Sequence, residues 1–177
     1  LHNPGANDSF SNADIPEEAL EDAALFHFGY PPIMRKMFEN DGAELEAIFR
    51  RVKAKGIATS LDLAAVDPDS AAGRADWEKI IARVLPHVDF FVPSFEELCF
   101  MLDRPRYEQL CSMGGDMTEN LDIERHVKPL ADRLMEMGAK ALLIKCGTSG
   151  IYYRTGDKAR LSQIGSRLGL DTELWAD

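Results

Sequence analysis

The sequence predicts a three-layer α/β/α fold built on a mostly parallel β-sheet. Short apolar runs closed by proline or glycine alternate with stretches of amphipathic helical spacing, which is the pattern of β–α–β units. The 177 residues are 45% hydrophobic and 28% charged, as in a globular chain, and no repeat or low-complexity tract divides them. We therefore expect one domain over residues 1–177, with right-handed crossovers between its parallel strands.

The first predicted β–α–β unit covers residues 24–63. Residues 24–30 form an apolar run that ends at a pair of prolines, which indicates a buried strand. Asp41 and Glu44 have the spacing of a capping box, so a helix is expected to begin at Asp41 and to end before Gly56. The buried face of this helix is expected to consist of Leu45, Ile48, Phe49 and Val52. The next apolar run, residues 57–63, predicts the second strand.

The same cycle then repeats. Asp76 is expected to cap a helix, and residues 89–92 form a third strand that leads into a short helix over residues 95–102. The apolar face of the first of these helices is expected to consist of Trp77, Ile80, Ile81, Val84 and Leu85. An irregular stretch follows residue 102, and residues 123–137 have the spacing of a longer helix.

The last predicted elements form a hairpin. Residues 141–144 read as a fourth strand, a tight connection follows, and residues 151–153 are expected to return antiparallel to it. In a parallel α/β sheet, ligands bind beyond the carboxyl ends of the strands. That rule selects Gly29 with Tyr30, Asp62, the stretch from Ser94 to Glu97, and the stretch from Lys145 to Gly150.

The composition argues against several classes of protein. Thirty acidic and twenty basic residues give a net charge of −10, which disfavours a nucleic-acid binder. No apolar run has the length of a membrane span, and the chain does not open with a signal peptide, so no membrane partner is expected. Three widely spaced cysteines, Cys99, Cys111 and Cys146, are typical of free thiols in the cytoplasm.

Three of the selected places offer both a structural and a functional interpretation. Ser94 and Glu97 have the spacing of a helix-capping box, but Glu97 could instead order the water shell of a magnesium ion. Asp62 is interpreted either as a solvated loop carboxylate or as a polar helper on the substrate side of a site.

The connection after the fourth strand has the same ambiguity. Gly147 and Gly150 suit the backbone angles of a tight turn, and they also allow backbone amides to approach an anion. Thr148 and Ser149 would add hydroxyl donors, and Lys145 would add a positive charge. The stretch lacks the Gly-Lys-Ser/Thr ending of a P-loop.

Three stretches together resemble the ribokinase-like (PfkB-type) carbohydrate kinases. The stretch from Asn3 to Asp8 is similar to their N/P-G-A-N stretch. Residues 89–97 resemble the strand that leads into the N-x-x-E motif, with Ser94 in place of the asparagine. Residues 141–150 resemble the V-x-V-T-x-G-x-x-G strand and phosphate-side loop, with Lys145 where threonine is common.

The resemblance implies an incomplete ribokinase-like kinase domain that phosphorylates a hydroxyl of a small sugar with ATP and Mg²⁺. It places Glu97 at the magnesium-handling glutamate, and Ser94 with residues 145–150 on the ATP side. The sugar pocket and the lid, which often forms a homodimer contact, are expected before Leu1. The catalytic base of the G-A-G-D motif is expected beyond Asp177, so this segment alone is expected to be inactive.

Two alternatives stay open at this point. One is a nucleoside kinase of the same family, and the other is a non-catalytic, regulatory nucleotide-binding member, to which Ser94 gives weight. An unrelated Rossmann-type oxidoreductase is disfavoured, because no glycine-rich fingerprint follows the first strand.

Overall fold

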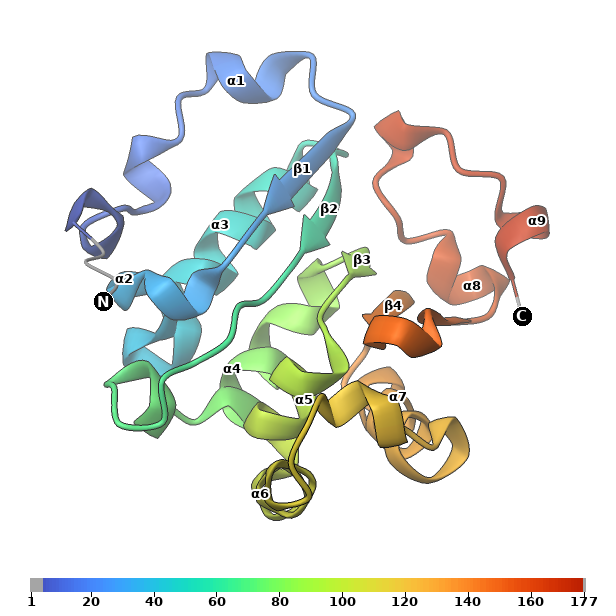
Figure 1. Cartoon of the computed structure of the whole chain (residues 1–177). Helices are drawn as coiled ribbons and strands as arrows, with labels where there is room; N and C mark the ends of the chain where they lie inside the picture. The colour runs from blue at the N-terminus through green and yellow to red at the C-terminus, as the bar shows by residue number, and fades with distance from the viewer. Residues whose placement is uncertain (1–4, 177) are drawn as a thin grey trace.

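The computed structural model describes residues 5–176, and its centre is a five-stranded sheet (Figure 1). Leu1, Asp177 and the Asn3-Pro4 start of the first kinase-like stretch lie outside the described residues. The strands are β1 (Leu25–Phe28), β2 (Ala58–Leu61), β3 (Phe90–Phe91), β4 (Ala141–Lys145) and β5 (Ile151–Thr155). Strands β1 to β4 are parallel, and β5 pairs antiparallel with β4, as predicted.

Helices precede, connect and follow the strands. They are α1 (Glu18–Glu21), α2 (Arg35–Phe38), α3 (Ala43–Ala54), α4 (Trp77–Val84), α5 (Phe95–Leu102), α6 (Arg104–Ser112), α7 (Lys128–Glu136), α8 (Lys158–Leu161) and α9 (Thr172–Trp175). No helix within residues 5–176 has both the length and the apolar character needed to cross a membrane.

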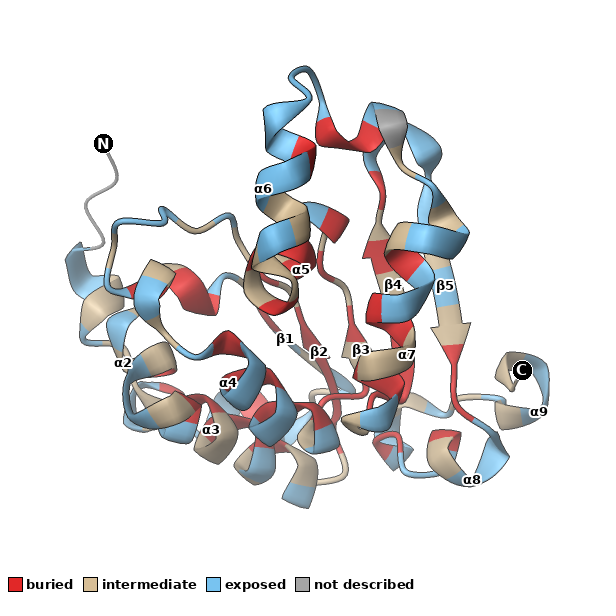
Figure 2. Ribbon diagram, turned by 90° about the horizontal axis from the view of Figure 1, so that it is seen from below, coloured by how far each residue is buried: buried red, intermediate tan, exposed pale blue. Residues whose placement is uncertain are grey.

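The order of the strands in the sheet is their order in the chain. Each parallel crossover therefore moves one strand in the same direction, and right-handed crossovers of this kind put their helices on the same face. Figures 1 and 2 show α3, α4, α5 and α7 gathered on that face. The large core lies between these helices and the sheet side chains Phe28, Leu61, Phe91, Leu142 and Ile144.

The opposite face of the sheet has a thinner cover. Leu161 and Ile164, in and after α8, pack on Ala58 in a second, smaller cluster. Farther along this face, Leu25 is 47% exposed and Ile151 is 64% exposed. The predicted mostly parallel sheet with flanking helices is confirmed, with long helices on one face and short ones on the other.

Helix α3 has the predicted buried face, but its predicted start was wrong. Asn40, Asp41 and Gly42 all have left-handed φ angles, and the helix begins only at Ala43. Asp41 therefore makes no helix cap; its carboxylate accepts a hydrogen bond from Lys79 Nζ at 2.6 Å. The Glu44 carboxylate accepts one from the Asn12 amide at 2.7 Å instead of closing a capping box.

The stretch after residue 102 is more regular than predicted, because residues 104–112 form helix α6. Asp103 caps its start by accepting a hydrogen bond from Arg106 N at 3.3 Å. Leu110 is the buried residue of this helix, so the sequence has no apolar stripe from which to predict it. The predicted helix over 123–137 opens as a π-helical turn, and α7 begins at Lys128.

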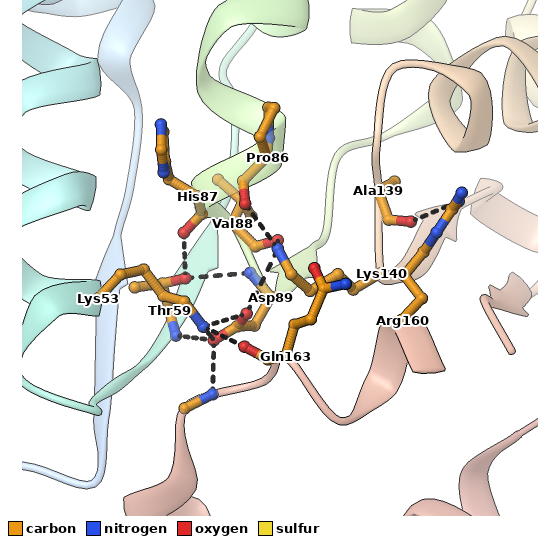
Figure 3. A network of polar contacts seen from close by, with 11 residues as sticks. Lys53, Thr59, Pro86, His87, Val88, Asp89, Ala139, Lys140, Arg160 and Gln163 are labelled. Carbon is orange, nitrogen blue, oxygen red and sulfur yellow. Dashed lines mark hydrogen bonds and ion pairs between the residues drawn. The ribbon is translucent and has the colours of Figure 1, made fainter. Parts of the chain in front are cut away.

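A buried ionic network lies at the amino ends of β2, β3 and β4 (Figure 3). The Asp89 side chain is fully buried and accepts hydrogen bonds from Lys53 Nζ at 2.7 and 2.8 Å. It also accepts from the amides of Thr59 and Gly165, at 3.0 and 3.1 Å. Lys140 Nζ lies 3.6 Å from the same carboxylate, and burial lowers the pKa of Lys140. The network ties α3, the sheet and the segment after α8 together.

Candidate functional site

The four places selected from the sequence lie along one edge of the sheet. Strands β1 to β4 run in parallel, and backbone hydrogen bonds continue the pairing past their carboxyl ends. The Asp62 amide donates to the Phe28 carbonyl at 3.0 Å, and the Lys145 amide donates to the Pro93 carbonyl at 2.9 Å. The predicted alignment of Gly29, Asp62, Ser94 and Gly147 along this edge is confirmed.

Two of the predicted site residues form an ion pair. Lys145 Nζ lies 2.7 and 2.8 Å from the two carboxylate oxygens of Asp62, a residue 83 positions earlier in the chain. The Asp62 side chain is only 15% exposed, so the interpretation as a solvated loop carboxylate was wrong. Because Asp62 offsets the charge of Lys145, an anion at this edge meets less positive potential than Lys145 alone would provide.

Ser94 and Glu97 form the predicted capping box at the start of α5. The Ser94 amide donates to Glu97 Oε2 at 2.7 Å, and the Glu97 amide donates to Ser94 Oγ at 3.2 Å. These two bonds satisfy backbone amides that the first turn of a helix leaves without partners. The capping interpretation is confirmed, and the magnesium role of Glu97 stays a prediction.

The cap leaves Glu97 one carboxylate oxygen for a magnesium ion or for one of the ion's waters. The Oε2 atom of Glu97 accepts the hydrogen bond from the Ser94 amide, so Oε1 is the oxygen that would contact the ion or its water. No group of three or more His, Cys, Asp or Glu side chains in the described part of the chain could hold a metal ion. Magnesium commonly takes one or two carboxylates and completes its shell with waters and substrate phosphates. A single carboxylate oxygen from Glu97 is compatible with that coordination.

The turn after β4 depends on its first glycine. Gly147 has a φ of 56° and opens a 3₁₀ turn that reaches Ser149. A Cβ atom on Gly147 would lie 2.2 Å from Thr118 Oγ1, so both the backbone angle and the close approach favour glycine. The Cys146 amide donates to the Gly150 carbonyl at 2.8 Å and closes the turn. The structural interpretation of these glycines is confirmed.

A segment that packs against this turn was not predicted from the sequence. A 3₁₀ turn over Met117–Asn120 lies on the Gly147–Ser149 turn, and Thr118 Oγ1 donates to Asp116 Oδ1 at 2.8 Å. The backbone hydrogen bond from Thr118, and after it the side-chain hydrogen bond, lower the pKa of Asp116. The available signal was the Asp-x-Thr spacing, which is typical of an aspartate that organises its own turn.

A cavity of about 440 Å³ opens beyond β1 and β2. Its walls come from three segments: Asp8, residues 32–38 and residues 65–72. A smaller hollow shares Ala65 and Val66 with it and is lined on its other side by Glu97 and Tyr107. The cavity and the Glu97 cap therefore lie on either side of the loop that follows β2.

Comparison with known proteins places the architecture. No protein-family model matches the sequence, and no curated protein matches it. Among solved structures, the chain is similar to a fructokinase with bound ATP from Xylella fastidiosa, with a TM-score of 0.52 and 18% identity over 82% of this chain. It is also similar to a PfkB protein from Polaromonas sp. JS666, with a TM-score of 0.51 and 22% identity over 87% of this chain.

The chain has the ribokinase-like fold. A third similar structure is an aminoimidazole riboside kinase from Salmonella enterica, with a TM-score of 0.51 and 16% identity over 88% of this chain. The chain spans 40%, 45% and 46% of the lengths of these three structures. The family resemblance read from the sequence is thus confirmed at the level of the fold, over a part of such a kinase.

Proposed function

We propose that this chain is the nucleotide-proximal part of a kinase that transfers a phosphoryl group from ATP to a hydroxyl of a small sugar or sugar-like alcohol. One observation carries the proposal: the Lys145–Asp62 pair, the Ser94–Glu97 cap and the Gly147 turn adjoin at the carboxyl edge of a ribokinase-like sheet. The ATP bound in the similar fructokinase supports it.

Each part has a role in this proposal. Phosphoryl transfer needs mainly positioning and neutralisation of phosphate charge, together with a base for the attacking hydroxyl. The exposed turn from Gly147 to Gly150 would approach the phosphates through its backbone amides and hydroxyls, and Lys145 would supply a positive charge. When magnesium is bound, it neutralises phosphate charge, and Glu97 would hold one of its waters. The base would come from a G-A-G-D motif beyond Asp177.

Substitutions of Lys145 and of Asp62 are expected to change the affinity for Mg-ATP in opposite directions. Lys145→Met is expected to weaken the binding of Mg-ATP by about three- to tenfold, because a cation beside the phosphates is lost. Asp62→Asn is expected to strengthen binding by a similar factor, because it frees Lys145 and removes a nearby negative charge. Calorimetric titration of the chain measures both. Lys128→Met, which removes an exposed lysine of α7, is the matched control. Equal affinities of the wild type and all three variants for Mg-ATP would show that the nucleotide does not bind at this edge.

Glu97→Gln separates the magnesium role from the cap. The glutamine carbonyl oxygen can still accept the hydrogen bond from the Ser94 amide, so the melting temperature is expected to change little. In a polypeptide extended through the base motif, turnover is expected to fall about ten- to a hundredfold and the magnesium requirement to rise. A lower melting temperature with unchanged kinetics in Glu97→Gln would show that Glu97 serves only to cap the helix. Nucleotide binding without turnover in the extended wild-type polypeptide would favour the regulatory alternative.

A further inference from the structure

The turn after β4 has internal hydrogen bonds that give it a shape but do not fix where it lies. Residues 147–150 are all exposed. The Ser149 amide donates to the Cys146 carbonyl at 3.1 Å, and the Gly150 amide donates to the Gly147 carbonyl at 3.1 Å. Gly147 and Gly150, with φ angles of 56° and 89°, place residues of high backbone freedom at both ends of the turn. A contact from outside is therefore needed to keep the turn in one position at the sheet edge.

Thr118 provides such a contact. A Cβ atom on Gly147 would lie 2.2 Å from Thr118 Oγ1, 2.8 Å from its Cβ and 3.0 Å from its Cγ2, so the threonine side chain lies directly against the glycine backbone. At the other end of the turn, the Ser149 hydroxyl donates to the Thr118 carbonyl at 3.5 Å. Thr118 thus contacts both the first and the last residue of the 3₁₀ turn.

The position of Thr118 is itself well determined. Thr118 is 8% exposed, and the preceding residue, Met117, belongs to the large core. Asp116 Oδ1 accepts hydrogen bonds from both the amide and the hydroxyl of Thr118, each at 2.8 Å. The bond to the hydroxyl selects the side-chain rotamer that lies against Gly147. Thr118 therefore joins the exposed turn to the core.

We propose that Thr118, held by Asp116, is a positioning residue of the nucleotide site. It keeps the Gly147–Ser149 turn in one place, so that the amides and hydroxyls of the turn are ordered before a phosphate binds. Thr118 acts through the turn and does not touch the phosphate. A turn that is already ordered loses less conformational entropy on binding, and the difference appears as affinity. The link to the nucleotide rests on the proposed kinase function, whereas the restraint of the turn by Thr118 does not.

Thr118→Ala and Thr118→Ser test this role in the 177-residue chain. Thr118→Ala removes the groups that lie against the turn, so hydrogen exchange of the Ser149 and Gly150 amides is expected to become about tenfold faster. Calorimetric titration is expected to show Mg-ATP binding weakened by about three- to tenfold. Thr118→Ser keeps the hydroxyl group, so both quantities are expected to stay within about twofold of the wild type.

Thr155→Ala is the matched control. Thr155 is 4% exposed, and its hydroxyl donates to the Trp175 carbonyl at 2.9 Å. It lies on the same hairpin as the turn but pairs with Ala141, at the opposite end of β4. Both alanine variants are expected to lower the melting temperature to a similar extent. Only Thr118→Ala is expected to change the turn and the affinity for Mg-ATP.

The two measurements distinguish the possible failures. Unchanged exchange of residues 147–150 in Thr118→Ala, or an equal change in Thr155→Ala, would overturn the positioning role. A loosened turn with unchanged Mg-ATP affinity would also overturn it, if Lys145→Met still weakens binding. If Lys145→Met has no effect on Mg-ATP binding either, the proposed nucleotide site is wrong, and the exchange rates alone decide whether Thr118 restrains the turn.

Discussion

Asp89→Ala is expected to lower the free energy of unfolding by about 3–5 kcal/mol, which is the cost of breaking a buried ion pair from one side. The variant would leave the buried Lys140 ammonium and the largely buried Lys53 ammonium without their anion. It would also remove the acceptor of two backbone amides, those of Thr59 and Gly165. An uncompensated charge and unpaired amides in the interior are each costly, and here they occur together.

Urea unfolding followed by circular dichroism measures this effect. Asp132→Ala is the matched control, because Asp132 pairs with Arg154 but is 49% exposed, and such surface pairs contribute about 1 kcal/mol or less. Asp89→Asn, which retains one carbonyl acceptor, is expected to fall between the two. If Asp89→Ala costs no more than Asp132→Ala, the network does not hold the amino ends of the strands together.

Gly165→Ala is expected to cost about 3 kcal/mol and to detach the segment after α8 from the sheet. A Cβ atom at this position would lie 2.2 Å from the Ala58 amide nitrogen and 2.3 Å from the Ile57 carbonyl carbon. Backbone atoms at the start of β2 cannot rotate away, so the segment itself must move. That movement would also break the hydrogen bond from the Gly165 amide to Asp89.

Hydrogen exchange is the direct measurement, and amides of residues 158–176 are expected to lose protection before those of the sheet. Gly29→Ala provides a control, because its Cβ would meet nothing closer than His27 Nε2 at 3.8 Å. Uniform loss of protection over the whole chain would show that the segment is no separate unit. Protection equal to that of Gly29→Ala would contradict the predicted clash.

The sequence was most informative about elements with a buried stripe or a buried run. The apolar runs predicted all five strands, and the i, i+3, i+4 spacing predicted the faces of α3 and α4. Helix α6 was missed because a surface helix is predicted from the regular spacing of its apolar residues. Leu110 is the one buried residue of this helix and makes no apolar stripe. The start of α3 was wrong because a left-handed turn at Asn40 and Asp41 overrides the local capping spacing.

The site could be predicted in its positions but not in its pairings. Topology placed Asp62 and Lys145 at the same edge, and local spacing predicted the Ser94–Glu97 cap. The ion pair between Asp62 and Lys145 joins residues 83 positions apart, which no local pattern encodes. The same holds for Asp89, whose partner Lys53 lies 36 positions away, and for the cavity, which three separate segments enclose.

Because β1 to β5 lie in the sheet in the order of the chain, these strands can pair one after another as they leave the ribosome. Each new strand from β2 to β5 finds its partner already formed, and no later strand has to insert between earlier ones. The exception is the segment around Arg167, whose guanidinium donates to the carbonyls of Leu20 and Glu21, 147 and 146 positions earlier. We therefore expect nascent chains that stop before Arg167 to have these five strands already paired, and the contact of Arg167 with residues 20–23 to form afterwards.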